Sequence, residues 1–123
     1  MKTTFDVAIV GAGPAGASAA ILLARAGWSV ALIERQSFPR RKVCGECIAA
    51  SNLALLDALG VGAAVCARAG AELRRVALMR GAETIVAALP AGEGAQRWGR
   101  ALGREHLDTL LADAAEAAGA TRM

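Results

Sequence analysis

Aromatic residues are scarce in this chain of 123 residues, at 3%, and it contains no tyrosine. Proteins that hold single-stranded nucleic acids stack bases on aromatic side chains beside basic residues, so this composition argues against a nucleic-acid surface. The net charge of +3 is too small to change that conclusion. Hydrophobic residues make up 55% and charged residues 20%, which predicts a globular domain rather than a disordered chain.

The sequence has only one histidine and three cysteines, and their spacing does not fit a conventional zinc site. Zinc takes about four ligands, and beyond the pair Cys44 and Cys47 only Cys66 and His106 remain, at spacings unlike those of zinc fingers. We therefore expect no metal site. We also expect His106 to be a surface histidine, and no catalytic acid or base can be named.

The first residues lack the apolar run of a secretory signal, because Asp6 stands where that run would lie. An odd number of cysteines without such a signal predicts a reducing, cytoplasmic setting. The apolar stretch 7–33 is interrupted by Pro14, Arg25 and four glycines, so we expect no transmembrane segment.

What the chain does have is a strand–helix–strand pattern. The run FDVAIV (5–10) is typical of a buried parallel strand, 17–27 predicts a helix that ends at a glycine, and 29–33 predicts a second strand. This spacing predicts an α/β fold that begins with a Rossmann-like βαβ unit. Further along we expect a polar loop at 36–46, a helix at 49–59, an ambiguous segment at 61–71, a β-hairpin insertion from strands 73–79 and 84–89, a glycine-rich loop at 90–103 and a helix at 105–118.

Between the first strand and its helix lies the motif GAGPAG, in which Gly11, Gly13 and Gly16 form G-x-G-x-x-G. Gly11 would permit the tight turn, Gly13 the approach of the backbone to a pyrophosphate, and Gly16 the packing of helix on strand. Pro14 suits the first helical turn, where its missing N–H costs nothing. The free N–H groups at the helix start would bind the phosphate charge.

Glu34 follows Gly16 by 18 residues, at the tip of the second strand. A carboxylate there accepts hydrogen bonds from ribose hydroxyls and would repel a 2′-phosphate, which argues against NADP at this site. The alternative is a glycine turn in some other α/β protein, with Glu34 on its surface.

The stretch DVAIVGAGPAGASAAILLARAGWSVALIER closely resembles the N-terminal FAD fingerprint of flavoprotein oxidoreductases. FPRRKVCGE and GRALGREHLDTLLADAAEAAGA resemble the group that joins flavin monooxygenases of the aromatic-hydroxylase type with geranylgeranyl reductases. The likeness covers 6–120 and is weakest between 61 and 98. It implies an FAD-dependent oxidoreductase, with a small-molecule substrate of apolar or aromatic character and NADPH, NADH or another electron donor.

The resemblance also implies contacts to the flavin nucleotide from Ala15, Glu34, Cys44, Gly45 and Arg104. Arg35 is our further candidate, and a contact from the basic residues at 40–42 stays open. The sequence departs from the group's pattern at Cys47, where an apolar residue or glycine is more usual. We expect Cys44 to line the cofactor site and Cys47 to be a dispensable buried thiol.

Arg104 has a separate physical argument. A cation at a helix N-terminus is disfavoured by the helix dipole by about 0.3–1 kcal/mol. A bound anion would offset this cost, because guanidinium and helix end would face the same negative charge. The alternative is a solvated arginine directed away from the helix end.

Relatives in this group run to several hundred residues, with a later Gly-Asp stretch and a second, substrate-covering domain. The resemblance therefore implies that residues 1–123 are the N-terminal part of an FAD-binding domain, truncated, with the substrate domain absent. Two other interpretations remain open. One is a flavoprotein disulfide reductase that uses Cys44 and Cys47, although the cysteines of such enzymes usually stand further apart on a helix. The other is a non-enzymatic nucleotide-binding module.

Overall fold

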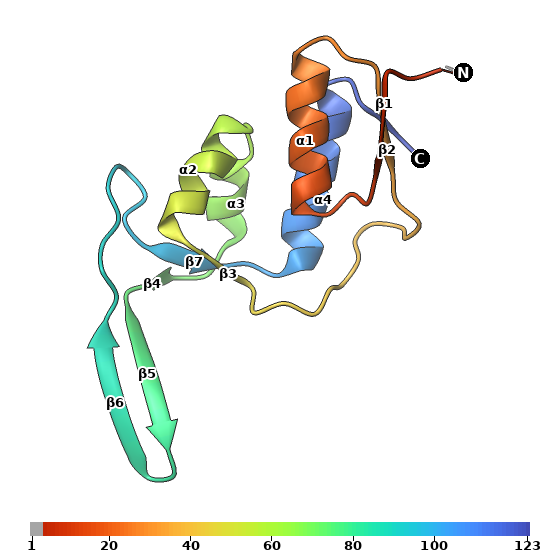
Figure 1. Ribbon diagram of the computed structural model, residues 1–123. Coiled ribbons are helices and arrows are strands. Elements are labelled where there is room, and N and C mark those ends of the chain that lie inside the picture. The colour runs from red at the N-terminus through yellow and green to blue at the C-terminus, as the bar shows by residue number, and fades with distance from the viewer. Residues whose placement is uncertain (1–3) are drawn as a thin grey trace.

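The structure of the protein is a computed structural model that describes residues 4–123 (Figure 1). It begins with a strand–helix–strand unit, β1 Val7–Val10, α1 Pro14–Arg25 and β2 Val30–Ile33. The α/β class and the Rossmann-like βαβ start are confirmed. The elements that follow are β3 Cys47–Ile48, α2 Ala50–Ala58, α3 Gly62–Arg68, β4 Glu72–Leu73, β5 Arg75–Arg80, β6 Glu83–Ala88, β7 Gly99–Ala101, α4 Arg104–Ala117 and β8 Thr121–Arg122.

The main sheet is parallel and has the strand order β1–β2–β8. Val7 pairs with Val30, and Ala31 pairs with Thr121. Helices α1 and α4 lie side by side against one face of this sheet (Figure 1). β2 is the most buried strand because it lies between two neighbours and under the helices, whereas Val10 of β1 is 84% exposed. Because the three strands are parallel, their carboxyl ends lie at the same edge of the sheet, which is where open parallel sheets bind ligands.

A second, antiparallel sheet of strand order β3–β7–β4 lies beneath helices α2 and α3 (Figure 1). The polar loop 36–46 joins the two sheets, as the sequence predicts. The hydrophobic core is continuous across both halves, since buried side chains from α1, α2, α3 and α4 form one cluster. The two halves therefore form a single packed body.

Strands β5 and β6 form the predicted hairpin, with six cross-strand pairs from Arg75–Ala88 to Arg80–Glu83. The hairpin projects away from the helices (Figure 1), and every residue of both strands is exposed. Its sequence forms strands because it is rich in β-branched and aliphatic residues such as Val76 and Ile85.

Two expectations about loops were incomplete. The segment 90–103 contains β7, which is held by β3 on one side and β4 on the other. Its three residues carry no strand signal of their own, so tertiary pairing decides the structure. The ambiguous segment 61–71 forms α3, whose buried Val65 packs in the core.

Among the described residues, no helix has both the length and the apolar character needed to cross a bilayer. The apolar stretch 7–33 is instead divided among β1, α1 and β2.

Candidate functional site

The turn from β1 to α1 has the shape that the glycine pattern predicts. Gly11 has φ +101°, a conformation that favours glycine, and its N–H donates a 2.7 Å hydrogen bond to the Ile33 carbonyl. A Cβ on Gly16 would lie 1.9 Å from the Gly11 carbonyl oxygen and 3.3 Å from a methyl of Ile9. Gly16 therefore allows α1 to approach β1, and only glycine fits.

Helix α1 begins without a side-chain cap. Its N-cap residue is Gly13, Pro14 occupies the first turn, and that turn contains no acidic side chain. A helix start normally satisfies its free N–H groups with a side-chain oxygen, with water or with a ligand. Here those amides, of which Ala15 supplies one, have no side-chain oxygen bound to them and carry the positive end of the helix dipole. The arrangement suits an anion.

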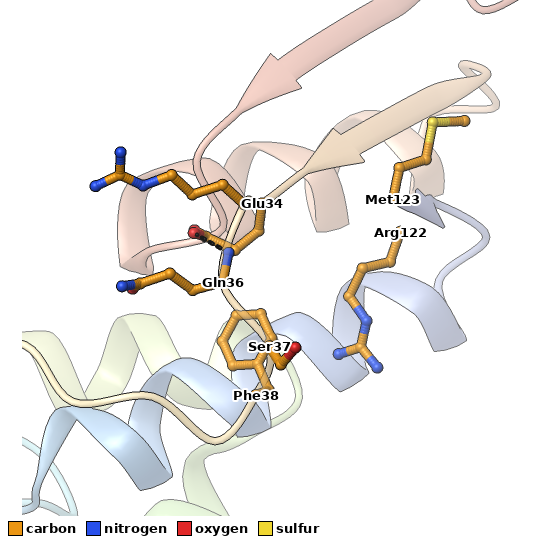
Figure 2. A pocket seen from close by; sticks show the side chains of 7 residues that line it. Glu34, Gln36, Ser37, Phe38, Arg122 and Met123 are labelled. Atoms are coloured by element: carbon orange, nitrogen blue, oxygen red, sulfur yellow. Dashed lines mark hydrogen bonds between the residues drawn. The ribbon is translucent and has the colours of Figure 1, made fainter.

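Glu34 lies at the end of β2 and is nearly buried, with 9% of its side chain exposed. Its Oε2 accepts hydrogen bonds from the Ala12 N–H and from Arg40 Nη2, both at 3.1 Å. Its Oε1 accepts a hydrogen bond from the Gln36 N–H at 3.2 Å (Figure 2). An ionised carboxylate has about four acceptor positions, so one remains for a ligand hydroxyl.

Burial opposes ionisation of Glu34, yet the hydrogen bonds from Ala12, Gln36 and Arg40 outweigh it and hold the pKa of this carboxyl below its usual value. Glu34 is therefore an anion at neutral pH.

Two hollows flank Glu34 at the carboxyl edge of the parallel sheet. Figure 2 shows the first, about 320 Å³ in volume, with Glu34 and Gln36 on one side and Phe38 below them. The second has a volume of about 400 Å³ and includes Val10 and Gly11. Arg35 is exposed and lines both hollows, which places this candidate beside Glu34.

The three basic residues that the sequence left undecided have different surroundings. Arg40 is buried, and it donates to Glu34 and also to Asp108 at 2.5 Å. Arg41 is 90% exposed and pairs with Glu105 at 3.1 Å. Lys42 is exposed and borders the hollow beside Gly11.

Asp108 of α4 is a central residue that the sequence interpretation missed. It is fully buried, and its carboxylate accepts hydrogen bonds from Arg40 Nη1, Arg104 Nε and Arg104 Nη2, the last two at 2.7 and 2.9 Å. A signal was present in the sequence. Asp108 lies four residues after Arg104 and on the same helix face as the buried Leu111 and Ala112.

Arg104 occupies the first position of α4, with 21% of its side chain exposed. Its Nη2 is 3.5 Å from the place where a Cβ on Gly13 would lie, so the guanidinium is beside the start of α1. The hydrogen bonds that Arg104 donates to Asp108, together with the adjacent Cys44, raise the pKa of Arg104. The guanidinium is directed to a carboxylate, not to solvent. Asp108 already supplies a negative charge that offsets the cost of placing a cation at the helix N-terminus. The position of Arg104 therefore does not by itself require a bound anion.

The loop that carries Cys44 and Gly45 is exposed. Cys44 lies on a groove of about 410 Å³ that is also lined by Pro14, Ala15 and Arg104, so the loop, the α1 start and the α4 start meet there. Cys47 is exposed, and the prediction of a buried thiol is wrong. Successive side chains of a strand point to opposite faces, and in β3 the inward position belongs to Ile48.

His106 is half-exposed, with its Nε2 3.6 Å from Glu105, as expected for a surface histidine. Most of the other sequence-predicted residues are brought together. The start of α1 is surrounded by Gly11, Gly13, Pro14, Ala15, Gly16, Arg104 and the loop that carries Cys44 and Gly45. Glu34 and Arg35 adjoin it at the sheet edge.

Comparison with known proteins shows the family to which the chain is similar. The sequence profile described as "FAD binding domain" matches residues 4–123. A menaquinone reductase of Mycolicibacterium smegmatis is 46% identical over 61 residues, which are 50% of this chain and 15% of that protein. A kynurenine 3-monooxygenase of Xanthomonas oryzae pv. oryzae is 37% identical over 127 aligned positions, covering 94% of this chain and 26% of that protein.

Among solved structures, a geranylgeranyl bacteriochlorophyll reductase-like protein from Thermoplasma acidophilum matches with a TM-score of 0.76 and 26% identity, over 96% of this chain and 29% of that one. The chain thus spans less than a third of the length of these proteins. The resemblance to the monooxygenase and geranylgeranyl reductase group is confirmed, and the disulfide reductase alternative gains no support.

Proposed function

The chain belongs to the family of FAD-binding domains, and we propose that it is the FAD-binding part of a flavin-dependent oxidoreductase. The observation that carries the proposal is the meeting of two anion-binding groups at one point. The uncapped start of α1 and the guanidinium of Arg104 come together at Gly13. Both groups suit a pyrophosphate, so the residues present fit the dinucleotide.

In this proposal the amides of Gly13, Ala15 and Gly16 hold the pyrophosphate, and Gly11 gives the chain the turn that exposes them. Gly13 suits this task because it brings no side chain between the backbone and the phosphate oxygens. Pro14 fixes the first turn without using a donor that the phosphate needs. Arg104 adds a charged donor next to the same amides.

Glu34 holds the adenosine ribose through the acceptor position that its three protein hydrogen bonds leave free. Arg35, which lines the hollows on both sides, lies against the adenosine. Cys44 lines the groove on the other side of the α1 start, and we propose that it and the adjoining Gly45 follow the nucleotide towards the flavin. In this proposal Glu34 and Arg35 lie at the adenosine end of the cofactor, and Cys44 lies towards its flavin end.

The whole protein would carry out a flavin reaction on a small molecule of apolar or aromatic character. Relatives named as a kynurenine 3-monooxygenase and a menaquinone reductase support this class. When bound, FAD supplies the redox chemistry, and this chain's residues bind and orient the cofactor. We propose NADPH or NADH as the electron donor that reduces the flavin. Hydroxylation and alkene reduction are both reactions of this class of flavin-dependent oxidoreductase.

The test is a titration with FAD of the protein, expressed as its gene encodes it, followed by flavin fluorescence. We expect one FAD per chain, displaced by ADP, because ADP keeps the groups that Glu34 and the α1 start recognise. Replacing Arg104 with Gln should weaken FAD binding by about tenfold to a hundredfold, since a charge-assisted hydrogen bond contributes about 1.5–3 kcal/mol.

The matched control is Arg41→Gln, because Arg41 is equally charged but 90% exposed and paired on the surface. FAD affinity should be almost unchanged in this variant. A wild-type protein that is folded and does not bind FAD would refute the proposed function, and equal affinity in Arg104→Gln would remove Arg104 from the site.

A further inference from the structure

We infer that Asp108 is a positioning residue for the cofactor. It fixes the position of Arg104, beside the phosphate site, relative to the carboxylate of Glu34 at the ribose site. The inference rests on the proposed function. Asp108 is fully buried and accepts three hydrogen bonds from two arginines, of which Arg104 lies on the same helix and Arg40 lies in the loop 36–46. A buried carboxylate with two cationic partners fixes the direction of both.

On one side, Asp108 fixes the guanidinium of Arg104. It binds the Nε and Nη2 edge, at 2.7 and 2.9 Å, so the planar group has a single orientation. A guanidinium has five N–H donors, and the donors of Nη1 remain free of Asp108. Because Nη2 lies against Gly13, this orientation keeps the cation beside the uncapped amides of α1.

On the other side, Asp108 fixes Arg40. Arg40 donates through Nη1 to Asp108 and through Nη2 to Glu34, and 5% of its side chain is exposed. The ring of Phe38 lies 4.9 Å from its guanidinium carbon and restricts it further. Arg40 thereby transmits the position of Asp108 to the Glu34 carboxylate. A buried chain of charged groups runs from Glu34 through Arg40 and Asp108 to Arg104.

A positioning role and a simple charge effect predict opposite results. Asp108→Asn removes one negative charge near the site, so Coulomb attraction alone predicts tighter binding of the anionic FAD. Loss of positioning predicts weaker binding, because an amide cannot accept from both arginines with the strength of a carboxylate. The sign of the change in affinity therefore separates the two explanations.

The experiment compares FAD dissociation constants for wild type, Asp108→Asn and Asp113→Asn, measured by flavin fluorescence at a temperature where circular dichroism shows each protein to be folded. We expect Asp108→Asn to bind FAD about tenfold more weakly. Asp113→Asn is the matched control, because Asp113 lies on the same helix with 59% of its side chain exposed and pairs with Arg122 at 2.9 Å. It makes the same change in charge and should leave affinity unchanged.

A second measurement tests whether Asp108 acts through Arg104. Arg104→Lys keeps the positive charge but loses the planar fork, and we expect it to weaken FAD binding about tenfold. Adding Asp108→Asn to Arg104→Lys should then cost clearly less than it does in wild type, because the two residues are coupled. A residue that only stabilises the fold would give additive effects.

Unchanged or tighter FAD binding in a folded Asp108→Asn protein would overturn the inference, even if that protein melts at a lower temperature. If this variant does not fold, Arg104→Lys decides alone, and wild-type affinity in it overturns the inference. A folded wild-type protein without FAD binding refutes the proposed function instead, so the two failures are distinct.

Discussion

Replacement of Glu34 with Gln is the sharpest test of the ribose contact. The substitution keeps the size of the side chain and removes its charge. The single acceptor position that the protein leaves free would lose a charge-assisted hydrogen bond to a ribose hydroxyl, which is worth about 1.5–3 kcal/mol. Since about 1.4 kcal/mol corresponds to a factor of ten, FAD affinity should fall by about tenfold to a hundredfold.

The assay is an FAD titration by fluorescence or calorimetry, accompanied by thermal unfolding without FAD. Glu83→Gln is the matched control, because Glu83 is also paired with an arginine but is 70% exposed on the hairpin. Wild-type affinity in Glu34→Gln would refute the ribose contact, and so would equal losses in both variants.

The same variant should show a pH-dependent loss of stability. The pKa of Glu34 is lowered in the folded state, so its ionised form stabilises the protein above the ordinary value of about 4.3. That contribution is lost as the pH falls from there through the lowered folded value. The difference in melting temperature between wild type and Glu34→Gln should therefore be full at pH 7 and shrink below about pH 4.

Two further predictions concern the glycine turn and the cysteine loop. Gly16→Ala should unfold the protein or abolish FAD binding, because its Cβ would lie 1.9 Å from the Gly11 carbonyl oxygen; a wild-type melting curve together with wild-type FAD affinity would contradict this. Cys47→Ser should leave FAD binding intact, whereas Cys44→Ser should weaken it, because only Cys44 adjoins Arg104 and the groove. Equal effects of both cysteine substitutions, with a Cys44–Cys47 disulfide in the oxidised protein, would favour a dithiol role.

Local sequence determines the part of the site that could be predicted. The turn through Gly11 and Gly16 depends on glycine conformation and on contacts within one βαβ unit, so spacing along the chain carries the information. Glu34 ends the second strand of the same unit, and its position follows from the strand. The hairpin was also predictable, because its pairs are close in sequence.

Distant contacts determine the part that could not be predicted. Arg40 and Asp108 are 68 residues apart, and no local pattern joins them. The direction of Cys47 depends on which residue of β3 faces the core, and a shift of one position reverses it. β7 is a strand only because β3 and β4 lie on either side of it.

The buried chain of charges also changes how the affinity for an anion is explained. Glu34 and Asp108 carry two negative charges, and Arg40 and Arg104 carry two positive charges, so these four side chains are neutral together. Net charge therefore gives this part of the site little attraction for a pyrophosphate. The attraction comes instead from N–H donors that are already oriented towards the pyrophosphate. These donors are the uncapped amides of α1 and the N–H groups of Arg104 that Asp108 leaves free. A neutral, prearranged set of donors has the further advantage that no buried charge lacks a partner before the cofactor binds.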